Sequence, residues 1–76
     1  MTEQEWIDIF GDNLRDILKE YGYTQRDLAD AIGVTESTIS RYINKQRMPT
    51  VPILINMSLE LGIELDEFAI FGDRIY

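Results

Sequence analysis

Two residue types that often carry chemistry are missing from this chain, because its 76 residues include no cysteine and no histidine. Without cysteine there is no disulfide framework, no thiolate zinc site and no cysteine nucleophile. Without histidine the chain lacks the commonest general base and the commonest transition-metal ligand. A chain this short also has little room for a deep substrate pocket. We therefore expect no enzyme, and neither catalytic residues, nor a metal site, nor a cofactor.

Long apolar runs are missing as well. No run approaches the roughly 20 residues that span a bilayer, and no basic-then-apolar stretch with a small-residue cleavage site stands at the N-terminus. Hydrophobic residues still make up 45% of the chain, which is enough for a globular core. We expect one cytoplasmic domain, residues 1–76, with no membrane partner.

The alternation of apolar and polar residues that is typical of β-strands is also missing, whereas apolar spacings of three and four recur. Threonines stand before the apolar stretches as N-cap candidates, and glycines follow as stops. The pattern predicts a compact all-α fold of five short helices, over residues 3–21, 25–32, 36–44, 51–61 and 65–71. The N-cap candidates are Thr2, Thr24, Thr35 and Thr50. The predicted core face of the first helix comprises Trp6, Ile7, Phe10, Leu14, Ile17, Leu18 and Tyr21.

The segment from Gln25 to Tyr42 has the residues needed for two helices that cross steeply over a short turn. Ala29 is small enough to let the second helix approach, and Gly33 tolerates the positive φ that the turn needs. Apolar residues would close the wedge between the helices, namely Leu28, Ile32, Val34, Ile39 and Tyr42. We interpret residues 25–44 as a helix-turn-helix with a polar exposed face on its second helix.

On these residues the chain resembles the Cro/repressor (XRE-like) family of helix-turn-helix proteins, the DNA-binding transcriptional regulators of phages and bacteria. The stretch YTQRDLADAIGVT (23–35) is similar to the family's opening helix and turn, and ESTISRY (36–42) to its recognition helix. The similarity continues through RMPT (47–50), LGI (61–63) and LDEF (65–68), and covers roughly residues 12–70. It implies a lambda-repressor-like fold and a sequence-specific, nucleoid-associated regulator, most simply a repressor, that inserts residues 36–44 into the major groove of duplex DNA.

The resemblance implies a DNA-binding role for nine polar residues. Those facing base edges are Glu36, Ser37, Ser40 and Arg41, and those at the sugar-phosphate backbone are Gln25, Thr38, Asn44, Lys45 and Arg47. Arg41 suits the O6 and N7 acceptors of guanine, and Glu36 suits the N4 donor of cytosine. Two simpler interpretations stay open. These residues could be ordinary solvated side chains of a helix surface, and Arg41 could pair with Glu36 or Asp30.

The net charge of −7 contrasts with the basic character that is usual in nucleic-acid binders. Residues 1–20 and 59–76 each carry −4, and residues 21–34 carry −1. Residues 35–58 carry +2, because Glu36 stands against Arg41, Lys45 and Arg47. We expect this central segment to face DNA, and the acidic flanks to disfavour non-specific binding.

Three features depart from the family pattern. Lys45 stands where glycine is usual, so a positive-φ turn there would be strained or the turn would differ; Ile43 stands where an acid is common. Residues 51–63 also hold more apolar side chains than a monomer needs to bury, namely Val51, Ile53, Leu54, Ile55, Met57, Leu59, Leu61 and Ile63.

We interpret this apolar excess, together with Phe68, Ile70 and Phe71, as a homodimer interface. Two-fold operators need two recognition helices one DNA turn apart, which a dimer supplies. The rival hypothesis is a protein-interaction module on the same fold that has lost DNA binding. Substitution of Arg41 and Gln25 by alanine would separate the two hypotheses.

Overall fold

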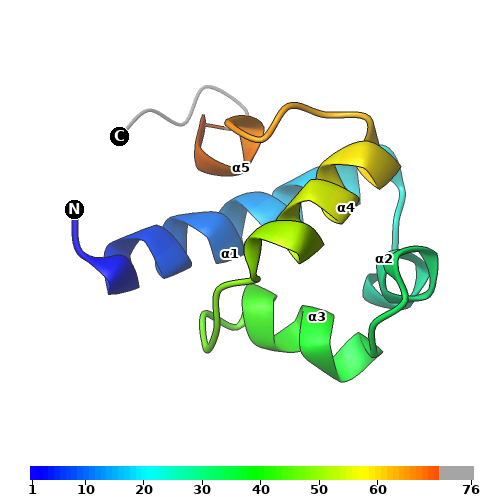
Figure 1. Ribbon diagram of the computed structural model, residues 1–76, viewed down its shortest axis with the longest axis horizontal. Helices are drawn as coiled ribbons and strands as arrows, with labels where there is room; N and C mark the ends of the chain where they lie inside the picture. The colour runs from blue at the N-terminus through cyan, green and yellow to red at the C-terminus, as the bar shows by residue number, and fades with distance from the viewer. Residues whose placement is uncertain (71–76) are drawn as a thin grey trace.

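The computed structural model describes residues 1–70, which form five helices and no strand (Figure 1). The helices are α1 (Glu3–Tyr21), α2 (Gln25–Ile32), α3 (Glu36–Ile43), α4 (Val51–Leu61) and α5 (Glu67–Ile70). The prediction of an all-α, five-helix fold is confirmed. No helix within these residues is long and apolar enough to cross a membrane.

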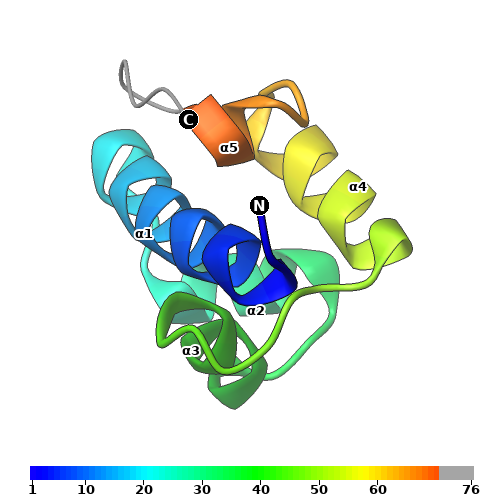
Figure 2. The ribbon, with the colours of Figure 1, turned by 90° about the vertical axis from the view of Figure 1, so that its left-hand side faces the viewer.

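The long helix α1 organises the molecule. It lies between the α2–α3 pair on one side and α5 on the other, and it packs against both α3 and α5 (Figures 1 and 2). The α4 helix packs against α2, and the chain from α3 to α4 passes the N-terminal end of α1 (Figure 2). The core lies where these helices meet and comprises Phe10, Leu14, Ile17, Leu18, Leu28, Ala29, Ile39, Tyr42, Met57, Leu61, Ile63 and Phe68.

Three of the four predicted threonine caps act through their side chains. Thr2 and Thr24 form complete capping boxes with Glu5 and Asp27, and the Thr35 hydroxyl accepts a hydrogen bond from the backbone N–H of Thr38. Each cap satisfies amide donors that the first turn of a helix leaves without an intrahelical partner. The helix starts that were predicted at these threonines are therefore confirmed.

The fourth predicted cap, Thr50, is wrong in its chemistry although its position is right. Thr50 has the extended backbone of an N-cap, but its side chain makes no cap hydrogen bond. The second residue of α4 is Pro52, whose ring fixes φ in the helical range and whose missing N–H costs nothing in the first turn of a helix. The start of α4 therefore depends on the fixed φ of Pro52 rather than on a side-chain cap.

Two other expectations are corrected at the ends of α1. Trp6 and Tyr21 are 43% and 42% exposed, so neither belongs to the core in which we placed it. A helix of 19 residues is about 28 Å long, whereas the eight residues of α2 or α3 span about 12 Å. The partner helices therefore cannot cover both ends of α1.

The fifth helix begins later than predicted. It begins at Glu67 rather than at residue 65, because Leu65 and Asp66 form a turn, and its described part ends at Ile70. Phe71, which we included in both the fifth helix and the apolar interface, lies outside the described residues. Phe68, also assigned to that interface, is instead buried in the core with its ring centre 5.3 Å from that of Phe10.

Candidate nucleic-acid interface

The predicted helix-turn-helix is present, with α2 and α3 joined by the three residues from Gly33 to Thr35. Gly33 has a φ of 76°, and its N–H and that of Val34 both donate to the carbonyl oxygen of Ala29. Ala29 is itself 1% exposed, as expected for a small residue where two helices approach. The wedge and turn that the sequence predicted are therefore confirmed.

The α3 helix presents two chemically different faces. Ile39 and Tyr42 point into the core, and the Tyr42 ring meets that of Phe10 edge to face at 6.3 Å between centres. Ile43 is half-buried and packs against the same core, which explains why an apolar residue stands at this position. On the other face, Glu36, Ser37 and Arg41 are exposed. The outward face of α3 is thus polar and free of apolar side chains that would need covering.

The remaining predicted site residues surround this face at different depths. Asn44 and Arg47 are exposed, whereas Gln25, Thr38, Ser40 and Lys45 are half-buried. Gln25 is the first residue of α2, and Asn44 is the C-cap of α3 rather than its last helical residue. Eight of the nine residues therefore lie on α3 or in the segment that follows it, and Gln25 lies on α2, which packs against α3.

Several of these side chains are already engaged with one another. The hydroxyls of Thr35 and Thr38 lie 2.9 Å apart, and the Nδ2 of Asn44 donates to the Oγ of Ser40 at 3.1 Å. The first contact lies at the start of α3, and the second joins Ser40 to Asn44 one turn later along one side of the helix. Arg41, by contrast, makes no ion pair with Glu36 or Asp30 within residues 1–70, so that alternative is not realised.

Lys45 adopts the positive φ, the first of the two possibilities that the sequence left open. Its φ is 65°, the one such value among the non-glycine residues from 1 to 70. Its N–H donates to the Tyr42 carbonyl, and the N–H of Gln46 donates to the Arg41 carbonyl, which together form the Schellman ending of a helix. Its ammonium lies 3.0 Å from an oxygen of Asp12. The turn therefore keeps the glycine-like shape, with a lysine in the strained position.

Sequence reasoning missed two positions on α1. A Cβ placed on Gly11 would lie 2.8 Å from the Tyr42 carbonyl oxygen, so only glycine allows α1 to approach the end of α3 this closely. Asn13 is fully buried, and its Nδ2 donates to the Phe68 carbonyl at 2.7 Å, which ties α5 to α1. A glycine inside a helical pattern and a polar residue beside an apolar face were the available signals.

Two side chains near the start of the helix-turn-helix have pKa values that are shifted mainly by a hydrogen bond to one neighbouring residue. The backbone N–H of Thr24 donates to the Asp27 carboxylate, and this hydrogen bond holds the pKa of Asp27 below its ordinary value. The Tyr23 hydroxyl donates to Glu60 at 2.9 Å, which raises the pKa of Tyr23 and joins the start of α2 to α4. Within the described residues, no group of three or more acidic side chains is arranged to hold a metal ion.

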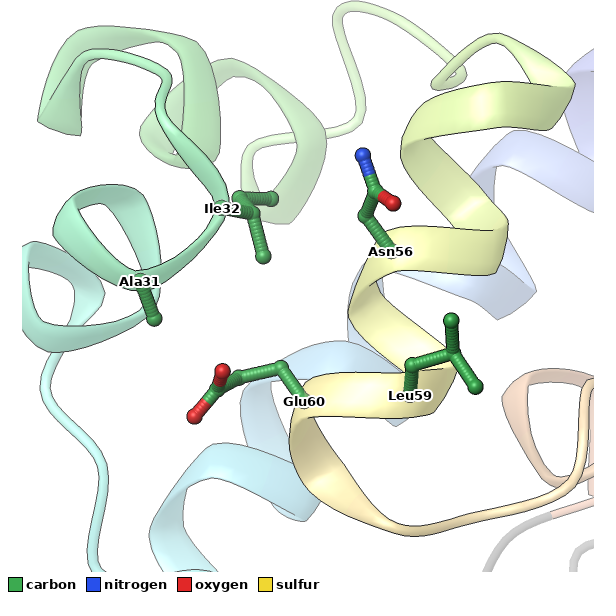
Figure 3. A pocket seen from close by; sticks show the side chains of 5 residues that line it. All are labelled: Ala31, Ile32, Asn56, Leu59 and Glu60. Atoms are coloured by element: carbon green, nitrogen blue, oxygen red, sulfur yellow. The ribbon is translucent and has the colours of Figure 1, made fainter.

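A shallow pocket of about 360 Å³ lies between α2 and α4 (Figure 3). Its lining is Ala31, Ile32, Asn56, Leu59 and Glu60, and none of these is among the nine predicted site residues. Leu59 reaches its rim while remaining 75% exposed. Glu60 is already bonded to Tyr23, and Asn56 supplies the other polar side chain of the lining.

The α4 helix carries a stripe of exposed apolar residues, which we call the α4 stripe. Val51, Ile55 and Leu59 are spaced four residues apart and are 67%, 42% and 75% exposed, whereas Met57 and Leu61 are buried. Residues four apart lie on one side of a helix. The apolar excess predicted for residues 51–63 is therefore real and divides between the core and the surface.

Two sequence relatives carry regulator names. The uncharacterized HTH-type transcriptional regulator YqaE of Bacillus subtilis is 34% identical over 58 residues, which cover 76% of this chain and 50% of that protein. A Pyrococcus furiosus protein named as an HTH-type transcriptional regulatory protein is 29% identical over 52 residues, covering 68% of this chain and 16% of that protein. The chain thus spans half the length of the first relative and a smaller share of the second.

Two solved structures have the same fold. The restriction-modification controller protein C.AhdI from Aeromonas hydrophila superposes with a TM-score of 0.77 at 26% identity, over 82% of this chain and 94% of that one. The hypothetical transcription factor NHTF from Neisseria superposes with a TM-score of 0.79 at 20% identity, over 91% and 79% of the two chains. The helix-turn-helix family model matches residues 14–68, which is more than half of the chain. The chain therefore belongs to the helix-turn-helix family of the Cro/repressor, XRE-like type.

Proposed function

We propose that this protein binds duplex DNA sequence-specifically and regulates transcription, with α3 as the recognition helix in the major groove. The observation that carries the proposal is the division of α3, whose Ile39 and Tyr42 anchor it in the core while Glu36, Ser37 and Arg41 project outward. A recognition helix must be held rigidly by one face and read base edges with the other. The regulator names of the two sequence relatives support the same assignment.

The exposed polar face suits direct readout. Arg41, which is free of an internal ion pair in residues 1–70, is available to donate to both O6 and N7 of guanine. Glu36 at the start of α3 suits the N4 donor of cytosine. Gln25 at the start of α2, and Asn44 and Arg47 after the end of α3, would set the register of α3 on the phosphates.

The charge distribution supports binding through a restricted surface. The segment from 35 to 58, which contains α3 and the loop after it, carries +2, whereas the rest of the chain is acidic. Acidic flanks repel phosphates outside this segment and so lower non-specific affinity. In this proposal the chain acts by occupying an operator, most simply as a repressor, and by binding rather than by catalysis.

The test is selection from a pool of random duplex DNA over a salt series, with the retained molecules sequenced. We expect enrichment of one motif and an affinity that falls as salt rises. Arg41→Ala should lower operator affinity about 5- to 150-fold, the value of a bidentate base contact of about 1–3 kcal/mol, without unfolding the protein. Lys19→Ala removes the same charge from α1 and is the matched control. The proposal would be refuted if the folded wild-type protein retained no DNA from the pool even at low salt.

We also propose that DNA is bound by a homodimer formed through the α4 stripe. The eight residues of α3 span about 12 Å, so one copy reads a short half-site, and a second copy is needed for a two-fold operator. Three exposed apolar side chains in one row are what a self-complementary two-fold interface would bury. Ile70, which is 47% exposed, is a candidate to extend it.

Sedimentation of Ile55→Glu against the wild-type protein tests this interface. We expect the variant to be folded and monomeric, and to lose the two-fold motif in the selection because the half-sites are no longer linked. Trp6→Gln, which removes a comparably exposed apolar residue from α1, should leave the assembly unchanged. A wild-type protein that is monomeric both free and on DNA would contradict the dimer.

A protein-interaction module remains the second candidate function, and the α4 stripe is the observation that favours it. Leu59 stands at the rim of the pocket between α2 and α4, so a partner's side chain could enter there (Figure 3). Such a module would be indifferent to Arg41→Ala and Gln25→Ala and sensitive to Leu59→Lys. A DNA-binding regulator would instead lose operator affinity with Arg41→Ala and Gln25→Ala.

A further inference from the structure

Lys45 occupies a backbone position that glycine fills at little cost. At a φ of 65° a residue with a Cβ is strained, and the two Schellman hydrogen bonds at the end of α3 require that conformation. The lysine side chain can offset this strain in two ways that glycine cannot, through a phosphate contact or through a contact inside the protein.

The surroundings of Lys45 are supplied by α1. The Lys45 ammonium lies 3.0 Å from the Oδ1 of Asp12, and its Cγ is 3.1 Å from the Cβ position of Gly11. Gln4 donates to the Lys45 carbonyl at 3.5 Å. Gly11 thus leaves space for the lysine stem, and Asp12 receives its charged end. The same Asp12 oxygen is 3.7 Å from a guanidinium nitrogen of Arg15, which is a weaker competitor for the carboxylate.

We propose that Asp12 holds the Lys45 ammonium on α1 and thereby withholds it from the DNA phosphates. Lys45 is then a positioning residue that fastens the end of the recognition helix to α1, and Asp12 is its partner. This inference rests on the proposed DNA binding and revises one of the nine residues assigned to it. The phosphate contacts at this end of α3 fall to Asn44 and Arg47, whose side chains are exposed.

The inference predicts how the salt dependence of DNA affinity changes in variants of Lys45 and Asp12. The logarithm of DNA affinity falls linearly with the logarithm of salt concentration, and each cation that neutralises a phosphate makes this negative slope steeper by about 0.9. If Asp12 already holds Lys45, Lys45→Gly leaves this slope unchanged, and Gly adopts the turn without strain. Asp12→Asn releases the ammonium, so the slope steepens by about 0.9 per protomer. Between about 50 mM and about 200 mM salt, the affinity of Asp12→Asn relative to wild type then falls about 3.5-fold per protomer.

The experiment is a double-mutant cycle on the selected operator, with wild type, Asp12→Asn, Lys45→Gly and the double variant. The double variant should return to the wild-type slope, which separates release of Lys45 from the general effect of removing an acid or of freeing Arg15. Asp16→Asn, one helical turn along α1, removes the same charge and should leave the slope unchanged. A loss of about 0.9 in slope for Lys45→Gly, or no change for Asp12→Asn, would overturn the inference.

A readout without DNA keeps this inference distinct from the proposed function. Asp12→Asn should lower Tm more in the wild-type background than in the Lys45→Gln background, because the pair exists in the free protein. Equal changes in both backgrounds would overturn the pair whatever the DNA result. Binding by wild type with an unchanged Asp12→Asn slope would refute this inference alone, whereas no binding by wild type would refute the DNA proposal as well.

Discussion

The recognition helix α3 and the neighbouring helix α4 bury apolar side chains in opposite ways. In α3 the apolar residues point inward and the outward face is polar. This helix therefore buries its apolar side chains within one molecule and leaves only polar groups for a partner. In α4 the inward face is apolar and the α4 stripe is apolar as well. The difference shows that the two helices meet different partners, because a polar surface suits base edges and phosphates whereas an exposed apolar row suits another protein.

The largest effect should come from the inward face of α3. Ile39 is fully buried, so Ile39→Ala should lower the free energy of unfolding by about 2–5 kcal/mol. Ile55→Ala on the α4 stripe is the matched control and should cost well under half as much in the monomer, because Ile55 is 42% exposed. Denaturant unfolding measures both. Equal losses would mean that α4 is anchored as tightly as α3 and would remove the contrast.

The next effect tests how closely α1 holds α3. Gly11→Ala places a Cβ 2.8 Å from the backbone oxygen of Tyr42, so we expect a loss of about 1–3 kcal/mol from overpacking, despite the better helix propensity of alanine. Gly22→Ala provides the contrast, since nothing lies within 4 Å of its Cβ and only its positive φ opposes the change. A stabilised Gly11→Ala variant would show that α3 can move away from α1.

A similar loss should follow from the buried contact between α1 and α5. Asn13→Leu leaves the Phe68 carbonyl without the donor that now lies 2.7 Å away, which should cost about 1–3 kcal/mol and increase hydrogen exchange in α5. Asn56→Leu, at an exposed position of α4, is the control and should change stability little. If exchange in α5 were unaffected, Asn13 would not be what holds this short helix.

The smallest effect concerns the capping boxes, which lie on α1 and α2 rather than on α3 or α4. Backbone hydrogen bonds from Thr2 and Thr24 lower the pKa values of Glu5 and Asp27. A carboxylate with a lowered pKa in the folded state contributes stability above its unfolded pKa and loses it as the pH falls through the folded value. Asp27→Asn should therefore flatten the acid limb of the stability profile below about pH 4.

Much of the architecture could be read from local patterns. The spacing of apolar residues and the threonine and glycine boundaries predicted five helices, and Ala29 and Gly33 placed the turn of the motif. These features depend on interactions a few residues apart, so the sequence carries them directly. The wrong predictions of burial at Trp6, Tyr21 and Phe68 arise from interactions between residues far apart in the sequence. Whether an apolar side chain is covered depends on the lengths and positions of helices that are distant in sequence.

The features of the candidate site also divide into those that the sequence predicted and those that only the tertiary structure showed. The sequence by itself determined which residues form the helix-turn-helix and that the outward face of α3 is polar, because helical periodicity assigns each residue to a face. Only the tertiary structure decided that Gly11 admits the end of α3, that Asn13 holds α5, and that Asp12 meets the Lys45 ammonium. Those contacts join α1 to residues more than thirty positions away, and no local pattern encodes where such partners meet.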